Sequence, residues 1–158
     1  LIPRTLSFAV ARTFPGYRTP LEFDNAPEDN QANAARGGTG CAGVATGDLA
    51  GDHTKVYVLG LASSKGSKGL AVIAFPRRGG WDFHRITSGV EDARFKQYVG
   101  VAPPGPYRRA ATVTAPLAPG EKQSIDCPHA AAVAGSVEGS KIVYCYDRGQ
   151  WSYVRVSD

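Results

Sequence analysis

Three apolar runs separated by two short polar turns lie between residues 55 and 86, and they constrain the fold more than any other feature. The middle run, residues 70–75, is short and almost entirely apolar, which is typical of a central strand covered on both faces. The last run, residues 81–86, alternates between apolar and polar side chains, as a half-buried strand does. This segment therefore predicts an antiparallel meander of three strands.

The rest of the chain also favours strands over helices. The 158 residues include 19 glycines and 11 prolines, and runs of helix-forming residues are scarce. Such a composition favours short strands joined by many turns. The C-terminal residues 141–147 and 150–156 alternate on either side of Arg148 and Gly149, which predicts a closing hairpin. Further strands are expected at residues 3–12, 44–46, 96–101, 107–113 and 130–135.

The length is that of one domain. We therefore predict a single all-β domain over residues 1–158, with mostly antiparallel sheets arranged as a sandwich or a small propeller and joined by long loops. Residues 1–40 form a loop-rich N-terminal segment, with one helical turn near residues 30–35, and residues 41–158 form the β core. No stretch approaches the roughly 18 apolar residues that a spanning helix needs. Because the chain begins at Leu1 rather than Met, we expect a processed chain, and an earlier signal peptide or lipid anchor stays open.

The three cysteines are Cys41, Cys127 and Cys145, so at most one internal disulfide can form. Their spacing does not match a zinc site. A single bridge in an exported protein is favoured, and three free thiols in a cytosolic protein is the alternative.

The net charge of +4 includes two arginine doublets, Arg77-Arg78 and Arg108-Arg109. Solvated loop charge is the simpler interpretation, and a positive face for an acidic partner is the functional one. The basic runs are too short for a nucleic-acid track, so nucleic acid is not an expected partner. Three loops supply the candidate contacts of such a face, residues 63–68, 77–80 and 103–109. The candidate partner-binding residues are Lys65, Lys68, Arg77, Arg78, Tyr107, Arg108 and Arg109.

Residues 47–55 resemble a calcium-binding turn, because Asp48 and Asp52 have the spacing of oxygen ligands. Ala50 and Val56 stand where further oxygen ligands belong, and His53 replaces the glycine of the sharp turn. Two carboxylates are too few for a tight site, so we predict no bound metal, with weak calcium binding left open. Instead, the two aspartates are expected to accept hydrogen bonds from the backbone of the turn.

Two further features, a glycine-rich motif and three histidines, give no support for a catalytic or cofactor site. Residues 38–43 match GxGxxG, but a polar loop precedes them and a strand follows, whereas a dinucleotide site needs the strand first and a helix after. His53, His84 and His129 stand in no recognised catalytic pattern and are interpreted as surface or boundary residues. We therefore predict a protein that is not an enzyme and needs no cofactor.

The order of several segments resembles a family of small exported bacterial proteins with FG-GAP/VCBS-like calcium loops. The similar pieces span residues 41–158 and follow one another in the order GDLAGD, VYVL, GLAVIAF, PPGPY, CPH, IVYCYD and WSYVRVSD. The resemblance implies an all-β protein that is periplasmic or lipid-anchored. It further implies an immunity protein or a lysozyme-inhibitor-like protein, which occludes a secreted cell-wall-degrading hydrolase or another toxic effector.

The resemblance also implies a cysteine pairing. An aromatic residue commonly stands in the family where this chain has Cys145, so the implied disulfide joins Cys41 to Cys127 and leaves Cys145 as a lone buried thiol.

Two other classes remain as alternatives. A cell-wall or carbohydrate-binding module would use Trp81, Trp151 or Tyr107 as stacking platforms, and exposed coplanar rings would favour it. A hydrolase would need a cleft that joins a histidine to a nucleophile, and the sequence offers no pattern for one.

Overall fold

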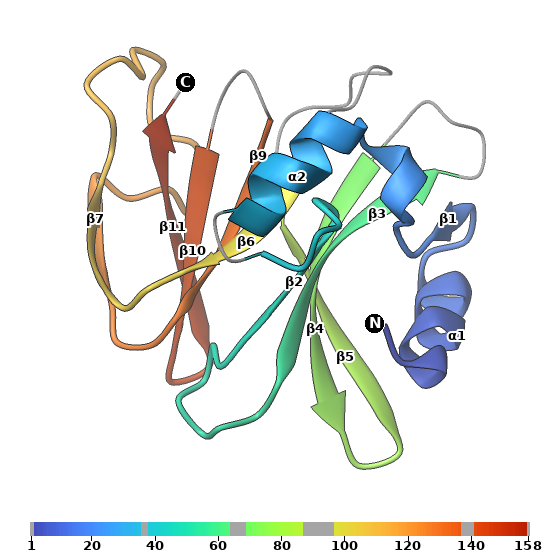
Figure 1. The fold of residues 1–158 in the computed structure, drawn as a ribbon. Coiled ribbons are helices and arrows are strands. Elements are labelled where there is room, and N and C mark those ends of the chain that lie inside the picture. Colours follow the sequence, from blue (N-terminus) through green and yellow to red (C-terminus); the bar gives the residue numbers. More distant parts are fainter. Residues whose placement is uncertain (1, 36–37, 64–68, 87–96, 137–140, 158) are drawn as a thin grey trace.

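The computed structural model describes residues 2–35, 38–63, 69–86, 97–136 and 141–157. Most of these residues lie in antiparallel strands, which confirms the predicted all-β class (Figure 1). Two helices and one 3-10 turn occupy the N-terminal segment: α1 (Arg4–Thr13), η1 (Glu22–Asp24) and α2 (Pro27–Ala35).

The first sheet contains the predicted meander. Its strands follow the order β1-β3-β4-β5, and β2 pairs with β3 on the same edge as β1. The apolar strand β4 lies between β3 and β5, as its composition predicts. The bounds are β1 (Tyr17–Arg18), β2 (Val44–Gly47), β3 (Val56–Ser63), β4 (Gly69–Arg77) and β5 (Gly80–Ile86).

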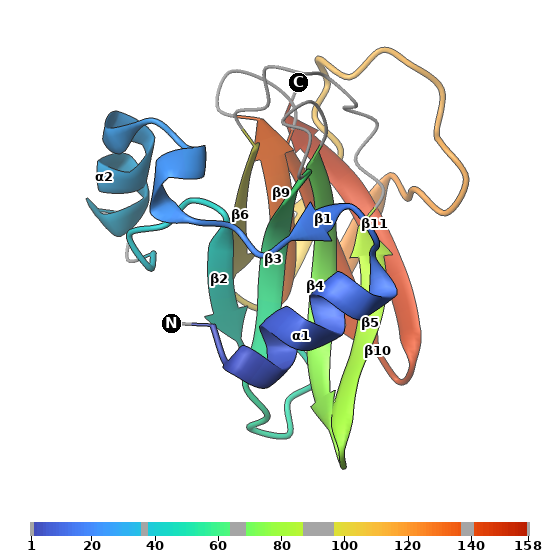
Figure 2. The same cartoon turned by 90° about the vertical axis from the view of Figure 1, so that its right-hand side faces the viewer.

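The second sheet follows the order β11-β10-β9-β6 and ends in the predicted hairpin. Its strands are β6 (Gln97–Ala102), β9 (Ala131–Ser136), β10 (Lys141–Asp147) and β11 (Gln150–Ser157). The amide of Val99 in β6 donates a hydrogen bond to the carbonyl of Ala42 at 2.8 Å, just before β2. The two sheets therefore meet at β2 and β6 and curl around one core (Figures 1 and 2).

The main core lies between the two sheets. Val58 and Ile73 from the first sheet and Val99 from the second have no exposed surface. Burying a side chain of this size stabilises the fold by about 1.5–3 kcal/mol. At the far side of the core, β5 and β11 are the outermost strands of their sheets, and aromatic side chains fill the seam between them.

Helix α1 covers the outer face of the first sheet, so the strand predicted at residues 3–12 is wrong. Leu6 and Val10 are fully buried there against side chains such as Leu59. The two residues are four positions apart and therefore share one face of a helix. Pro3 immediately precedes the helix, where its missing amide costs no hydrogen bond. The helix α2 is also longer than the single turn that was predicted.

A two-stranded ribbon covers part of the outer face of the second sheet. It consists of β7 (Gly105–Arg108) and β8 (Ser124–Cys127), so the strand expected at residues 107–113 ends early and pairs with a strand that was not predicted. Ile125 and Cys127 point inward against Val143 and Cys145 of β10. The chain from residue 109 to 121 forms a loop beside β11.

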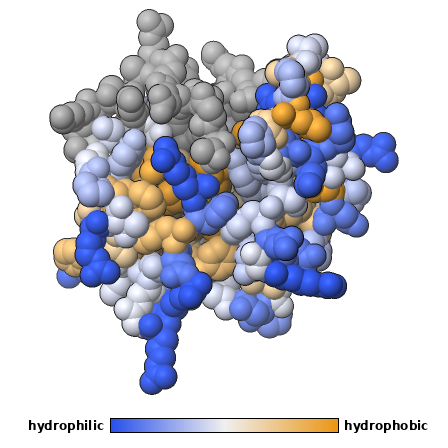
Figure 3. Space-filling model, turned by 180° about the vertical axis from the view of Figure 1, so that it is seen from behind, coloured by the Kyte–Doolittle hydropathy of each residue, from blue (hydrophilic) through white to orange (hydrophobic). Residues whose placement is uncertain are grey.

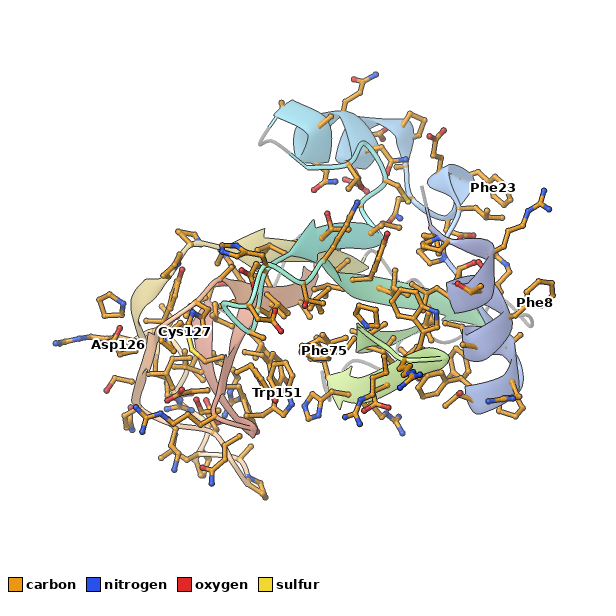
Figure 4. The ribbon with its side chains drawn as sticks, turned by 90° about the horizontal axis from the view of Figure 1, so that it is seen from below. Phe8, Phe23, Phe75, Asp126, Cys127 and Trp151 are labelled. Atoms are coloured by element: carbon orange, nitrogen blue, oxygen red, sulfur yellow. A yellow bond between two sulfur atoms is a disulfide. The ribbon has the colours of Figure 1, made fainter. Side chains whose placement is uncertain are left out.

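The disulfide joins Cys127 to Cys145, with 5.3 Å between their Cα atoms, so the pairing of Cys41 with Cys127 is wrong (Figure 4). The ribbon places Cys127 directly over β10, within the range that a bridge requires. Cys41 is free and half-buried, beside Asn33 of α2, whose side-chain amide donates to its carbonyl. The resemblance implied that Cys145 is a lone buried thiol, and this is wrong as well.

Candidate partner-binding surface

Three turns gather at one end of the sandwich, which is the lower end in Figures 1 and 2. They connect β2 to β3, β4 to β5, and β10 to β11. The β4–β5 turn projects furthest, and Gly79 gives it the left-handed backbone conformation that a tight turn needs, with φ of 82°. Seen from behind, hydrophilic side chains project from this lower edge (Figure 3).

The doublet Arg77-Arg78 lies at the β4–β5 turn, and its two members differ. Arg77 forms an ion pair with Asp82, the third residue of β5, across the hairpin. Arg78 is exposed and forms no ion pair with any residue that the structure describes. On the neighbouring β10–β11 turn, Arg148 is 92% exposed and lies 3.8 Å from Asp147. Arg78 thus places at the tip of the molecule a guanidinium that no described residue pairs with.

The second predicted doublet lies elsewhere. Tyr107, Arg108 and Arg109 lie in or just after β7, on the outer face of the second sheet and away from the lower turns. The hydroxyl of Tyr107 donates to the carbonyl of Pro103 at 2.5 Å, and burial raises the pKa of this phenol. Arg108 is exposed. Lys65 and Lys68 fall outside the described residues.

Arg109 takes part in a buried ion network instead of facing solvent. Its Nε lies 3.0 Å from a carboxylate oxygen of Glu121, and Arg155 approaches the same carboxylate at 2.7 Å. The Glu121 side chain is fully buried. The hydrogen bonds from Arg155, with those from Ala118 and Arg109, hold the pKa of Glu121 down to about 2. This network fixes the loop before Glu121 onto β11, so Arg109 is a structural residue.

The calcium-like turn is held by its own aspartates, as predicted. Asp48 accepts hydrogen bonds from the amides of Gly51 and His53, at 2.7 and 2.9 Å, and Asp52 accepts one from Thr54 at 2.9 Å. His53 adopts a left-handed φ of 63°, the conformation for which the turn normally uses glycine. Among the described residues, no group of three or more His, Cys, Asp or Glu side chains could hold a metal ion.

His84 belongs to a cluster of aromatic rings that fills the seam between β5 and β11. Its ring stacks on Trp151, with centroids 4.4 Å apart and planes 10° apart. Phe75 lies 6.0 Å from Trp151 and 5.4 Å from Tyr146 by ring centroids. Viewed from below, Phe75 and Trp151 lie between the two sheets (Figure 4). Burial lowers the pKa of His84. The cluster closes the seam by ring packing rather than by a strand ladder.

The two tryptophans are packed rather than presented as platforms. Trp81 contacts Tyr57 edge to face, with centroids 5.7 Å apart, and its Nε1 donates to the Thr5 hydroxyl at 3.4 Å. Trp151 is stacked on His84, and Tyr107 is hydrogen-bonded to its own loop. Half-buried rings with different partners do not form a coplanar binding face, which counts against the carbohydrate-binding alternative.

A groove of about 660 Å³ lies between α1 and the β4–β5 turn. We call it the helix–hairpin groove, and its lining includes Thr5, Phe8 and Arg12 from the helix and Pro76, Arg77 and Trp81 from the hairpin. Phe8 is 76% exposed and lies on the outer side of α1 (Figure 4). The groove therefore combines an exposed aromatic ring with cationic side chains.

The groove does not follow from the strand predicted at residues 3–12, because one of its walls is a helix. The helical spacing was present, since Leu6 and Val10 give one face and Arg4, Phe8 and Arg12 give another at intervals of four. Trp81 lies 76 positions beyond Thr5, and no local pattern brings them together.

Comparisons with protein families, with characterised proteins and with solved structures give no match for this chain. The resemblance to calcium-loop proteins therefore remains a prediction. No helix in the described part of the chain is long and apolar enough to cross a membrane. Fold and surface together define a disulfide-linked antiparallel β-sandwich with a basic projecting turn at one end.

Proposed function

We propose that this chain is an exported protein that binds another protein and occludes its active-site cleft, as an inhibitor or immunity protein does. The observation that carries the proposal is the β4–β5 turn, which projects from the lower end and presents Arg78 without an ion-pair partner among the described residues. A narrow projecting hairpin of this kind is shaped to enter a cleft.

The charge of the turn favours an acidic cleft. Arginine binds carboxylates through paired charge-assisted hydrogen bonds, and a positive surface speeds encounter with a negative one. Enzymes that cleave glycosidic bonds, including those of the cell wall, work with two carboxyl groups beside the scissile bond. Arg78 entering such a site would pair with these groups and exclude the substrate.

The disulfide between Cys127 and Cys145 supports an exported location such as the periplasm. Disulfides persist in oxidising compartments and are rare in the reducing cytosol. The bridge also suits a protein that must keep its fold outside the cell.

The test mixes the purified protein with the secreted cell-wall hydrolases encoded near its gene and measures binding and peptidoglycan hydrolysis. We expect one of them to be inhibited at a stoichiometric ratio. Arg78→Glu should weaken this inhibition at least tenfold. Arg108→Glu is the matched control, because it makes the same charge change on the ribbon and should leave inhibition unchanged. Full hydrolysis by every such enzyme in excess protein would exclude the proposal.

A further inference from the structure

We infer that the helix–hairpin groove binds an apolar side chain of the partner, on a short segment in which carboxylates flank that side chain. The inference rests on the proposed function, because the groove borders the turn that carries Arg78. It adds a second contact, which selects the partner by its sequence next to the cleft rather than by the cleft itself.

The apolar part of the groove comes from both sides. Phe8 projects from α1 with 76% of its surface exposed, and Pro76 and Trp81 lie opposite on the hairpin. Aromatic side chains exposed beside a concavity are typical anchors of protein interfaces, because burying them removes a large apolar area from water. An apolar side chain inserted here would cover the Phe8 ring.

The rim of the groove is cationic. Arg12 in the last turn of α1 and Arg77 on the hairpin line the groove, and Arg78 follows Arg77 in the turn beside it. Neither Arg12 nor Arg78 forms an ion pair with a residue in the described ranges, and residues 1–21 contain no Asp or Glu. The nearby Asp82 is already paired with Arg77. Charge complementarity therefore calls for carboxylates on both sides of the inserted side chain.

The shape of the groove favours a peptide segment over a bilayer surface. About 660 Å³ falls within the range of about 300–1,000 Å³ that concave ligand sites occupy. A helix that lies on a membrane presents a continuous apolar face with several large residues. Helix α1 exposes a single large apolar side chain among its described residues, Phe8, while Leu6 and Val10 face the sheet.

The test uses three synthetic peptides and no effector protein: acetyl-EEEFEEE-amide, the same peptide with Ser in place of Phe, and acetyl-KKKFKKK-amide. Binding is followed by amide chemical shifts of the isotope-labelled protein. We expect saturable shifts at residues 5–13 and 76–81 with the first peptide, and affinity at least tenfold weaker for the other two. Shifts elsewhere, equal affinity for the Phe and Ser peptides, or no saturation would overturn the inference.

Matched variants locate the site. Phe8→Ser should weaken binding of the acidic peptide at least tenfold, whereas Phe23→Ser should not, although Phe23 is equally exposed at 78%. Arg12→Glu should weaken it likewise, and Arg148→Glu should not. Loss of binding to anionic lipid vesicles in Phe8→Ser, without any peptide binding by the native chain, would assign the surface to a membrane and refute the inference.

The two proposals fail separately. If the native chain inhibits a hydrolase but does not bind the acidic peptide, the groove contact is excluded and the Arg78 hairpin remains the inhibitory element. Peptide binding at the groove without inhibition of any hydrolase would remove the proposed function.

Discussion

The imidazole of His84 lies flat on the indole of Trp151, with ring centroids 4.4 Å apart, across the seam between the first and the second sheet. The contact joins β5 and β11, the strands that end the two sheets. Phe75 and Tyr146 pack around the same indole. Since a hydrogen-bonded ladder is absent between β5 and β11 in the described residues, these rings hold the two edges together.

Trp151→Ala should destabilise the fold by about 2 kcal/mol or more, because truncating a packed aromatic side chain leaves a cavity. Chemical denaturation measures the change in free energy of unfolding. Trp151→Phe is the control, since it keeps a ring against Phe75 and His84, and it should cost less than half as much. Equal losses in both variants would show that ring packing does not close the seam.

His84 should make stability depend on pH. Burial lowers its pKa in the folded protein, so the unfolded chain binds a proton more readily. The stabilisation of the fold by neutral His84 is then complete above the unfolded pKa of about 6.5, and it decreases as the pH falls through that value. We expect Tm to fall between pH 7.5 and pH 5.5, and His84→Phe to reduce that fall. An identical pH profile in the variant would contradict this assignment.

Glu121→Gln should destabilise the protein by about 3 kcal/mol, because it leaves Arg109 and Arg155 partly buried without their counter-charge. The native carboxylate has its pKa lowered to about 2. Its contribution is therefore present above the unfolded value of 4.5 and is lost as the pH falls from there towards 2. Urea titrations at pH 7 and pH 3 should show a smaller difference between variant and native protein at pH 3.

Cys145→Ser should destabilise the protein by about 3 kcal/mol, because the native bridge closes a loop of 18 residues in the unfolded chain. Cys41→Ser is the control and should change Tm little. When the unsubstituted protein is denatured without a reductant, thiol titration should find one free thiol per chain. This thiol should be absent from Cys41→Ser. Three free thiols in protein purified under oxidising conditions would refute the bridge.

Tm should stay nearly unchanged when calcium is added and when it is removed with a chelator. The reason is that the carboxylate oxygens of Asp48 and Asp52 already accept hydrogen bonds from backbone amides. Asp48→Ala should lower Tm, since the amides of Gly51 and His53 lose their acceptor. Asp48→Asn keeps an acceptor oxygen and should lower it less. A large rise in Tm with calcium would show that the turn still binds the ion.

Local patterns predicted the strands that appear in the sequence as short apolar or alternating runs closed by turn residues. The meander β3–β5 and the hairpin β10–β11 belong to this group, because their turns and side-chain periods are readable over a few residues. Helix α1 was missed, because partial alternation over a ten-residue segment is compatible with both periods until Leu6 and Val10 find a surface to cover.

The candidate site was predictable only in part. The projecting Arg77-Arg78 turn follows from the local sequence, whereas the role of Arg109 depends on Glu121, which lies twelve positions away. The disulfide partner of Cys127 likewise depends on which strand the ribbon covers, and no local signal in a single sequence carries that information.

The order of strands along the chain has a consequence for biosynthesis. Residues 17–86 build the first sheet, and residues 97–157 build the second, so a ribosome completes one before it begins the other. Until β6–β11 emerge, Val58 and Ile73 have no opposite layer to pack against. Exposed apolar strands are prone to aggregate, so a half-synthesised chain that has begun to fold is exposed to that hazard until its second half is available.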